Sequence, residues 1–295
     1  MAIWIENQML KNLDDQIWEK SEYMAEVLGC KPLFGAVGGS ISLNLANQSS
    51  DIDFYLVTET QTDMLQTLHY NDTKVDFICV ELEDLQKECK KFTEKQYQYP
   101  TRFYRNESET ASIMSVDDVE RPDFKREMIM RIFLAEEILE FERGSVVIAY
   151  RKLRDALKLI DIWNYHFNRA YGNYHEKIKG KEKVLLRKYL YIISQISICH
   201  MILNGEEVIM DCKQVIERVG CICNNQEISC LCYGLWEENN QEIKRKNECY
   251  IYANPILDEW IEQNLDMLLY KMREKEKLLR ENTYGFVPSK IRGLE

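Results

Sequence analysis

The sequence lacks an excess of basic residues. Lysine and arginine number 38 against 49 aspartates and glutamates, which gives a formal net charge of −11. Proteins that bind the nucleic-acid backbone draw much of their affinity from lysine and arginine, so this balance disfavours a large nucleic-acid surface. It favours small or cationic partners, although overall charge does not describe a single cleft.

The sequence also lacks a membrane-length apolar run and a recognisable secretory leader. The longest apolar stretch, residues 189–203, is interrupted by Gln195 and His200 and is too short to span a bilayer. No basic cluster follows Met1 of the kind that opens a signal peptide. We therefore expect a cytoplasmic protein without a membrane partner, in which the ten cysteines are reduced thiols.

Neither the cysteines nor the four histidines form a usual metal or nucleophile pattern. The tightest cysteine group has gaps shorter than those of most zinc sites, so we interpret it as free thiols, with zinc as the alternative. This group consists of Cys221, Cys223, Cys230 and Cys232. His200 lies among apolar residues and is expected to be a hydrogen-bonded core imidazole.

Short apolar runs alternate with helical patterns in the first 120 residues, which predicts an α/β arrangement. Residues 33–37 are typical of a buried strand, and Ser40 is placed to cap a short helix reaching about Ala46. The other expected elements are a helix at 8–28, strands at 51–57, 74–80 and 111–116, and helices at about 62–68 and 83–91.

From about residue 122 the pattern changes to successive amphipathic helices. Each apolar stripe keeps i, i+3/i+4 spacing, so each helix is expected to bury one face in a bundle. The stripes lie at 128–139, 146–167, 185–203 and 257–280. We therefore predict two domains, a catalytic α/β domain at 1–120 and an all-α acceptor-binding bundle at 121–295.

Three aspartates are the strongest candidates for chemistry. Asp51 and Asp53 project from the same face if residues 51–57 form a strand, and an adjacent strand would bring Asp76 beside them. Clustered carboxylates repel one another unless cations hold them together, and hard oxygen ligands select Mg²⁺ or Mn²⁺. The pattern predicts a site for divalent metals.

A glycine turn, Gly38-Gly39-Ser40, precedes these aspartates. Glycines let the backbone approach a phosphate closely, and amides at a helix start, together with the Ser40 hydroxyl, favour an anion. Each pattern alone is common. Together and in this order they favour phosphoryl or nucleotidyl transfer, which requires mainly alignment and charge stabilisation.

The residues Gly39-Ser40, Asp51, Asp53 and Asp76 resemble the signature of the DNA polymerase β-type nucleotidyltransferase superfamily. The resemblance implies a small mixed sheet with helices, ATP or another NTP as co-substrate, and transfer of a nucleoside monophosphate with release of pyrophosphate. It implies that Ser40 contacts phosphate, that Asp51 and Asp53 bind both metal ions, and that Asp76 binds the catalytic metal or acts as base.

The helical half has a weaker likeness. Asn173-Tyr174, Lys179-Gly180 and the segment Lys188–Tyr191 resemble part of the predicted nucleotidyltransferases that are linked to RNA repair. The general plan, an acidic-triad domain followed by helices, is similar to that of the antibiotic nucleotidyltransferases that modify aminoglycosides and lincosamides.

Several charged residues could complete the site or could simply be solvated. Arg187 and Lys188, with Lys183, could reach a triphosphate from the second domain, or could form the exposed face of their helix. The same alternatives stand for Arg102 and Arg105, and for three possible acceptor-binding carboxylates, Glu136, Glu137 and Glu140.

The leading hypothesis is a metal-dependent nucleotidyltransferase that modifies a hydroxyl of a small molecule, for example an antibiotic in a resistance reaction. The acceptor would lie between the sheet and the bundle. The alternatives are transfer to an RNA end or a protein side chain, and a nucleotide-binding regulator without turnover.

Overall fold

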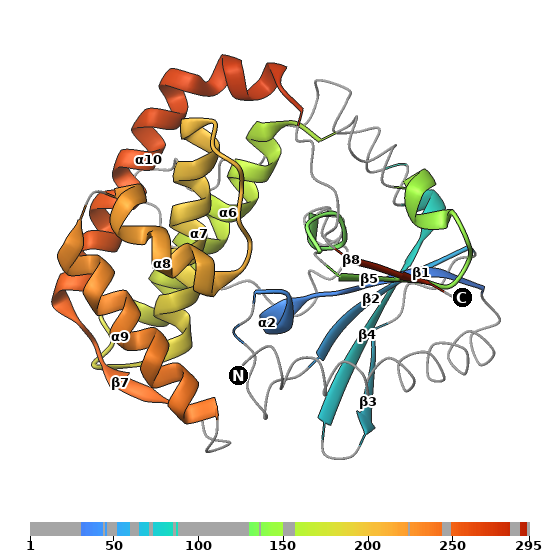
Figure 1. The fold of residues 1–295 in the computed structure, drawn as a ribbon, viewed down its shortest axis with the longest axis horizontal. Helices are drawn as coiled ribbons and strands as arrows, with labels where there is room; N and C mark the ends of the chain where they lie inside the picture. Colours follow the sequence, from blue (N-terminus) through green and yellow to red (C-terminus); the bar gives the residue numbers. More distant parts are fainter. Residues whose placement is uncertain are drawn as a thin grey trace, which may run out of the picture.

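The computed structural model describes residues 31–43, 45, 52–59, 65–70, 73–84, 87, 130–135, 137–149, 157–223, 225–243, 249–283 and 290–293. Within these residues a small mixed sheet lies beside a group of long helices (Figure 1). The strands of the sheet are β1 (Pro32–Val37), β2 (Ile52–Thr58), β3 (Leu65–Tyr70), β4 (Thr73–Glu81), β5 (Glu137–Glu140) and β8 (Lys290–Gly293).

The helical half is built from α6 (Leu159–Asn173), the π-helical turn η3 (Tyr174–Ile178), α7 (Leu186–Asn204), α8 (Cys212–Cys223), α9 (Gln226–Ile243) and α10 (Pro255–Glu281). We predicted that this half is all-α, but it also contains two short strands. The strands β6 (Lys183–Leu185) and β7 (Tyr250–Tyr252) pair antiparallel because the chain enters α7 and α10 in extended conformation. No helix in the described part of the chain is long and apolar enough to span a membrane.

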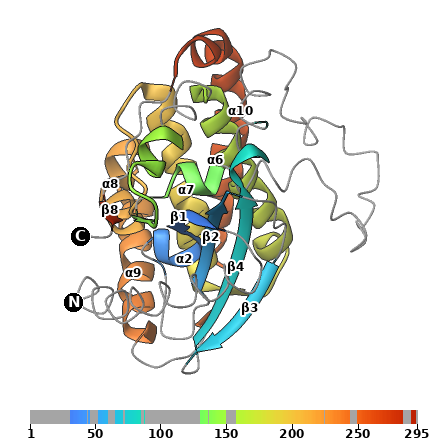
Figure 2. The same ribbon diagram turned by 90° about the vertical axis from the view of Figure 1, so that its right-hand side faces the viewer.

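The strand order of the large sheet is β3-β4-β2-β1-β5-β8. The pairs β2·β4 and β5·β8 are parallel, and the other neighbouring pairs are antiparallel. Figure 2 shows β1, β2, β4 and β3 in this order. Two strands, β5 and β8, come from the part of the chain that we assigned to the helical domain. Residues 1–120 therefore do not build the sheet alone, although the predicted boundary near 120 lies outside the described residues.

The centre of the sheet consists of β1 and β2, as their apolar sequences predict. Phe34, Phe54 and Tyr55 are completely buried, and such aromatic side chains account for much of the apolar area that the core removes from water. Gly35 is required between the two strands, because a Cβ at this position would lie 2.1 Å from Cζ of Phe54. The core places the carboxyl end of β1 beside the start of β2.

The expected helix at 62–68 is wrong, because residues 65–70 form β3. This strand pairs along its whole length with β4, from Tyr70↔Thr73 to Leu65↔Ile78. The two strands form a hairpin in which Tyr70 lies opposite Thr73. Tertiary pairing with β4 outweighs the weak helical spacing of this short segment. The expected helix at 83–91 is seen only at residues 82–84 and 87.

The stripe at 128–139 is also not one helix. Residues 130–133 are helical, but Ile138 and Leu139 belong to β5 and are buried between neighbouring strands. An apolar pair in a short strand fits a helical stripe equally well, which explains the error. The helix at 8–28 and the strand at 111–116 lie outside the described residues.

The predicted long helix at 146–167 is interrupted. Residues 145–149 form a short helix, and α6 begins only after Lys158, which is extended and pairs with Thr283. Asp161 stabilises the start of α6 by accepting a hydrogen bond from the Lys158 backbone N–H at 3.1 Å. The first turn of the helix is therefore fixed next to the end of α10.

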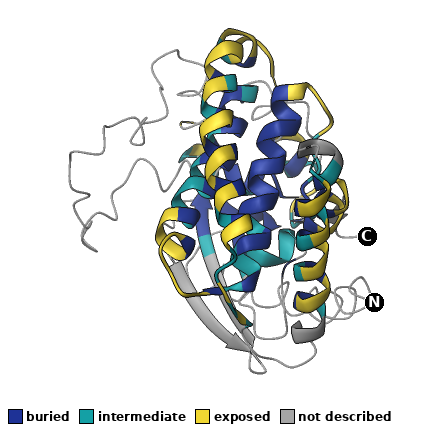
Figure 3. Ribbon diagram, turned by 90° about the vertical axis from the view of Figure 1, so that its left-hand side faces the viewer, coloured by how far each residue is buried: buried dark blue, intermediate teal, exposed yellow. Residues whose placement is uncertain are grey.

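The helices α7 and α10 match their predictions closely. α7 ends at Gly205, whose φ of +71° provides a left-handed C-terminus, and α10 begins with Asn254 accepting hydrogen bonds from two backbone N–H groups. α7 is buried on nearly every face, since α6, α8, α9 and α10 all contact it. Figure 3 shows the exposed residues as stripes along the outer helices.

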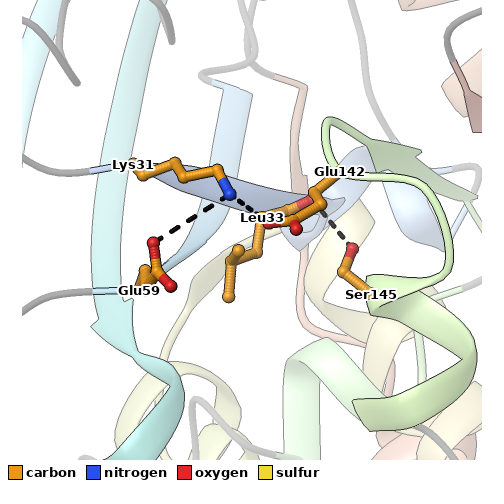
Figure 4. A network of polar contacts seen from close by, with 5 residues as sticks. All are labelled: Lys31, Leu33, Glu59, Glu142 and Ser145. Carbon is orange, nitrogen blue, oxygen red and sulfur yellow. Dashed lines mark hydrogen bonds and ion pairs between the residues drawn. The ribbon is translucent and has the colours of Figure 1, made fainter.

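A polar network at the surface joins the start of β1 to the ends of β2 and β5 (Figure 4). Lys31 Nζ lies 2.7 Å from Glu142 Oε2 and 4.0 Å from Glu59 Oε2, and Ser145 Oγ donates to the Leu33 carbonyl at 2.9 Å. Exposed ion pairs of this kind contribute at most about 1 kcal/mol each. The network therefore links these strand ends with little gain in stability, and none of its residues lines the cavity described below.

Candidate functional site

A glycine turn at the end of β1 contacts an aspartate at the start of β2. The Gly38 N–H donates to the Asp53 carbonyl oxygen at 2.8 Å, and Gly39 has φ of +65°. A Cβ added to Gly39 would lie 1.9 Å from Asp53 Oδ2, which is a severe clash. Only glycine therefore permits both the turn and the position of the Asp53 carboxylate.

Gly38 is constrained in the same way by Tyr55, which follows Asp53 by two residues on β2. A Cβ at Gly38 would lie 2.2 Å from Cε2 of Tyr55. The Tyr55 hydroxyl accepts a hydrogen bond from Arg131 Nη1, and burial raises the pKa of Tyr55 to about 12, so it stays protonated. The turn is thus supported from beneath by a buried tyrosine and an arginine from the segment before β5.

We predicted that Ser40 caps a short helix. It lies in the turn, but its side chain does not cap the helix. The short helix α2 is Gly39–Ser42, its N-cap is Gly38, and no side chain caps it. It ends at Ser42 rather than near Ala46. The Ser40 carbonyl oxygen accepts from the Leu45 N–H at 2.8 Å, and the Ser40 side chain lines the cavity.

The helices α6 and α7 face the glycine turn across a cavity. Polar side chains pair along the contact between the two helices. Lys188 Nζ donates to Asn173 Oδ1 at 3.3 Å, and Arg169 Nε donates to the Tyr191 hydroxyl. One turn earlier in α6, His166 forms a third pair, with its Nδ1 atom 2.7 Å from Gln195 Oε1. These polar side chains lie in an otherwise apolar contact between the two helices, and each is positioned by a hydrogen bond to its partner.

A stacked arrangement of cations and rings completes this wall. The Arg169 guanidinium lies 5.4 Å from the ring centre of Tyr165 and 5.5 Å from that of Tyr191. Lys188 Nζ lies 5.7 Å from the ring centre of Tyr191. All three distances are within the range of cation–π attraction, which favours these positions of the charged groups.

These two walls enclose one cavity of about 410 Å³, a volume within the range usual for small-ligand sites. Its lining includes the glycine turn with Ser40 and Asp53 on the sheet side, and Arg187 and Lys188 on the helical side. Four of the predicted site residues, Gly38, Gly39, Ser40 and Asp53, therefore line the same cavity as the two basic residues predicted from the helical half.

The electrostatics of the cavity are opposite to those of the chain. Four basic residues line it, Arg131, Arg169, Arg187 and Lys188, whereas Asp53 is the one acidic residue among the lining residues that the structure describes. Burial lowers the pKa of Lys188, and the charges of Arg187 and Arg169 lower it further. Four basic side chains around one cavity favour an anionic ligand.

Asp76 pairs with Asp53 across the parallel β2·β4 ladder, which is the register that the predicted metal site requires. Asp51 and the side chain of Asp76 lie outside the described part of the structure. Among the residues it describes, no three histidine, cysteine or acidic side chains gather as a metal site. The carboxylate cluster and the zinc alternative both stay predictions.

Other predicted candidates lie elsewhere. Lys183 is exposed in β6 over the ring of Tyr252, and Glu140 in β5 accepts from the Val146 N–H at 3.1 Å instead of facing an acceptor. His200 is a buried imidazole bonded to Asn264 Oδ1 at 2.9 Å, as predicted. Arg102, Arg105 and Glu136 lie outside the described residues, as does the side chain of Glu137.

Sequence reasoning missed Arg131, Arg169 and the His166–Gln195 pair. The signal for the pair was present, because both residues interrupt apolar stripes at positions that face each other once α6 and α7 pack antiparallel. Arg131 gave no such signal, since its role depends on contact with Tyr55 in a distant strand.

No protein-family model and no curated protein matches the chain. Among solved structures, it is similar to a nucleotidyltransferase-like protein from Exiguobacterium sibiricum 255-15. The two are 11% identical, the TM-score is 0.28, and the alignment covers 86% of this chain and 72% of that chain. A likeness at this level carries no argument about fold or function.

Proposed function

We propose that the protein is a metal-dependent nucleotidyltransferase that moves a nucleoside monophosphate from an NTP, with ATP as the expected donor, to a hydroxyl group of an acceptor. The observation that carries the proposal is the shared cavity. It combines a glycine turn held against Asp53 with four basic residues on its walls.

The triphosphate would lie between the turn and the helical wall. Glycine lets the backbone approach a phosphate closely, so the Gly39 amide and the Ser40 hydroxyl can donate to phosphate oxygens, whereas the Gly38 amide is already bonded to the Asp53 carbonyl oxygen. Arg187 and Lys188 can add charge-assisted hydrogen bonds from the opposite side, which are about twice as strong as neutral ones.

The donor set fits a hard divalent cation such as Mg²⁺ or Mn²⁺, with Asp53 lining the cavity and Asp76 in register beside it. Asp51, Asp53 and Asp76 would hold it. When bound, such a cation neutralises charge on the phosphates and lowers the pKa of an acceptor hydroxyl. The contact between Gly39 and Asp53 fixes this carboxylate at the turn before any ligand arrives.

In the transfer itself, the acceptor oxygen forms a bond to the α-phosphorus while the bond to the bridging oxygen of pyrophosphate breaks. Asp76 takes the proton from the acceptor hydroxyl. The basic residues stabilise the charge that accumulates on pyrophosphate, which is the main requirement of such a reaction.

The charge of the cavity bears on the acceptor. Among the described lining residues, the four basic ones outnumber the carboxylates even if Asp51 and Asp76 are added to Asp53. A polycationic aminoglycoside would meet like charge there, so a neutral or anionic hydroxyl compound fits better. An RNA end is the second candidate, because it is anionic and the same four basic residues favour it.

The experiment combines protein, Mg²⁺ and NTPs labelled at the α-phosphate with aminoglycosides, lincosamides, neutral sugars and short RNAs. Pyrophosphate release and label transfer are both followed, with Asp53→Asn as the matched control. We expect transfer to a neutral or anionic compound and none in the variant. Absence of Mg²⁺-dependent NTP binding by calorimetry would contradict the proposal as a whole.

A further inference from the structure

A buried imidazole in the cavity wall has no part in the chemistry proposed above. His166 lies on α6, is 1% exposed and lines the cavity. Its Nδ1 lies 2.7 Å from Gln195 Oε1 on α7. Because a carbonyl oxygen can only accept, Nδ1 carries the ring proton, and Nε2 is left as an unprotonated nitrogen with a lone pair.

The Nε2 atom of His166 has no hydrogen-bond partner among the described residues, and it is closed to solvent. A buried acceptor without a donor costs free energy, and such groups are uncommon in folded proteins. A ligand in the cavity can supply the donor that the surrounding residues do not. Contact requires a rotation of the ring or of the side chains that cover Nε2.

The imidazole differs from the four basic residues in what it can bind. Burial lowers the pKa of His166 to about 4, and the charge of Arg169 acts in the same direction, whereas the Gln195 bond opposes it. The ring is therefore neutral near pH 7. It attracts a donor hydrogen and has no charge with which to attract phosphate.

The lining near the imidazole suits the uncharged part of a nucleotide. Tyr165 lies edge-on to the His166 ring, with ring centres 5.1 Å apart. Apolar side chains, among them Leu43, Leu45 and Met210, also line the cavity. A nucleotide combines an anionic chain with a nucleoside that has apolar faces and a few N–H and O–H groups, so both parts find a matching surface.

We propose that His166 Nε2 accepts a hydrogen bond from an N–H or O–H group of the nucleoside of the bound NTP. Gln195 is a positioning residue that keeps the proton on Nδ1. This proposal rests on the proposed function and adds to it a contact that selects among nucleotides. The base amino group and the ribose hydroxyls share the required chemistry.

A purely structural alternative exists on the same helix. The indole N–H of Trp163, one turn before His166, is also buried without a partner among the described residues. A buried water that joins the two groups would satisfy both of them without any ligand. The test must therefore separate a ligand contact from an internal water.

The first measurement is calorimetric binding of the Mg²⁺ complexes of ATP, its analogue without the 6-amino group, 2′-deoxy-ATP and 3′-deoxy-ATP. The wild type is compared with His166→Phe, which removes the acceptor, and His166→Gln, which keeps one. We expect one analogue to bind the wild type about fivefold to tenfold more weakly than ATP. In His166→Phe this difference should vanish, and in His166→Gln it should partly return.

The second measurement is ¹⁵N NMR of the imidazoles, which is tractable because the chain has four histidines. His166 should show a protonated Nδ1 and an unprotonated Nε2, and ATP should shift the Nε2 signal. In Gln195→Leu the tautomer signature should be lost, an effect that a merely structural role for Gln195 would not produce.

The outcomes separate the two proposals. If the nucleotides bind and release pyrophosphate but the four affinities keep the same ratios in His166→Phe, the His166 contact is wrong and the proposed function stands. An Nε2 signal unchanged at saturating ATP has the same meaning and supports an internal water. If none of the nucleotides binds the wild type, both proposals fail.

Discussion

Replacing Gly39 by alanine tests the contact on which the site is built. The substitution has two costs, because the backbone has φ of +65° and the new Cβ would lie 1.9 Å from Asp53 Oδ2. The left-handed conformation costs a residue with a Cβ about 1–2 kcal/mol. The clash requires the carboxylate to move, at a further cost of about 1–3 kcal/mol.

Gly205→Ala is the matched control. Gly205 has φ of +71°, but nothing lies within 4 Å of the Cβ that would be added there. It should therefore show the backbone cost alone. Chemical denaturation of both variants gives the free energies of unfolding, and we expect Gly39→Ala to lose about 1–3 kcal/mol more than Gly205→Ala.

A double-mutant cycle locates this difference. In an Asp53→Ala background the carboxylate that clashes is absent, so Gly39→Ala should cost only about as much as Gly205→Ala. Turnover by Gly39→Ala alone should fall about a hundredfold, because the carboxylate is displaced by an ångström or more. Equal losses of stability for the two glycines, or no coupling with Asp53, would refute the close contact.

Asp53→Asn should abolish pyrophosphate release while thermal melts without metal stay within a few degrees of the wild type, because the amide keeps the shape but loses the charge; normal turnover would exclude this residue from the metal site. Lys188→Ala should weaken binding of inorganic tripolyphosphate about tenfold and reduce its salt dependence, since Lys188 lines the cavity, whereas the exposed Lys183→Ala should change neither; equal effects would argue against a localised phosphate site. The lowered pKa of His166, about 4, means that the unfolded chain takes up this proton first as the pH falls below 6.5. The wild type should therefore lose about 3 kcal/mol of stability between pH 6.5 and 4 through this residue, a loss absent in His166→Phe; parallel stability curves would contradict the buried neutral state.

The centre of the sheet was predictable because its signals are local. Residues 33–37 form a continuous apolar run that ends at glycine, and the strands holding Asp53 and Asp76 have the same character. Their adjacency was a condition of the predicted carboxylate cluster, and the pairing of Asp53 with Asp76 was not predicted. The structure has the register that this cluster requires.

The edges of the sheet were not predictable in the same way. β3 depends on pairing with β4, and β8 joins the sheet from the far end of the chain. The pairing of β5 with β8 joins segments that are far apart in sequence and leaves no periodicity in either segment. The His166–Gln195 pair is similar, since each residue alone is only a polar interruption in an apolar helix.

The most direct test of the central claim is a crystal structure with Mn²⁺ and a non-hydrolysable ATP analogue. We predict anomalous manganese density at the Asp53 carboxylate and the triphosphate between the turn at Gly38–Ser40 and the side chains of Arg187 and Lys188. Nucleotide bound elsewhere, or manganese absent from Asp53 while nucleotide occupies the cavity, would contradict it.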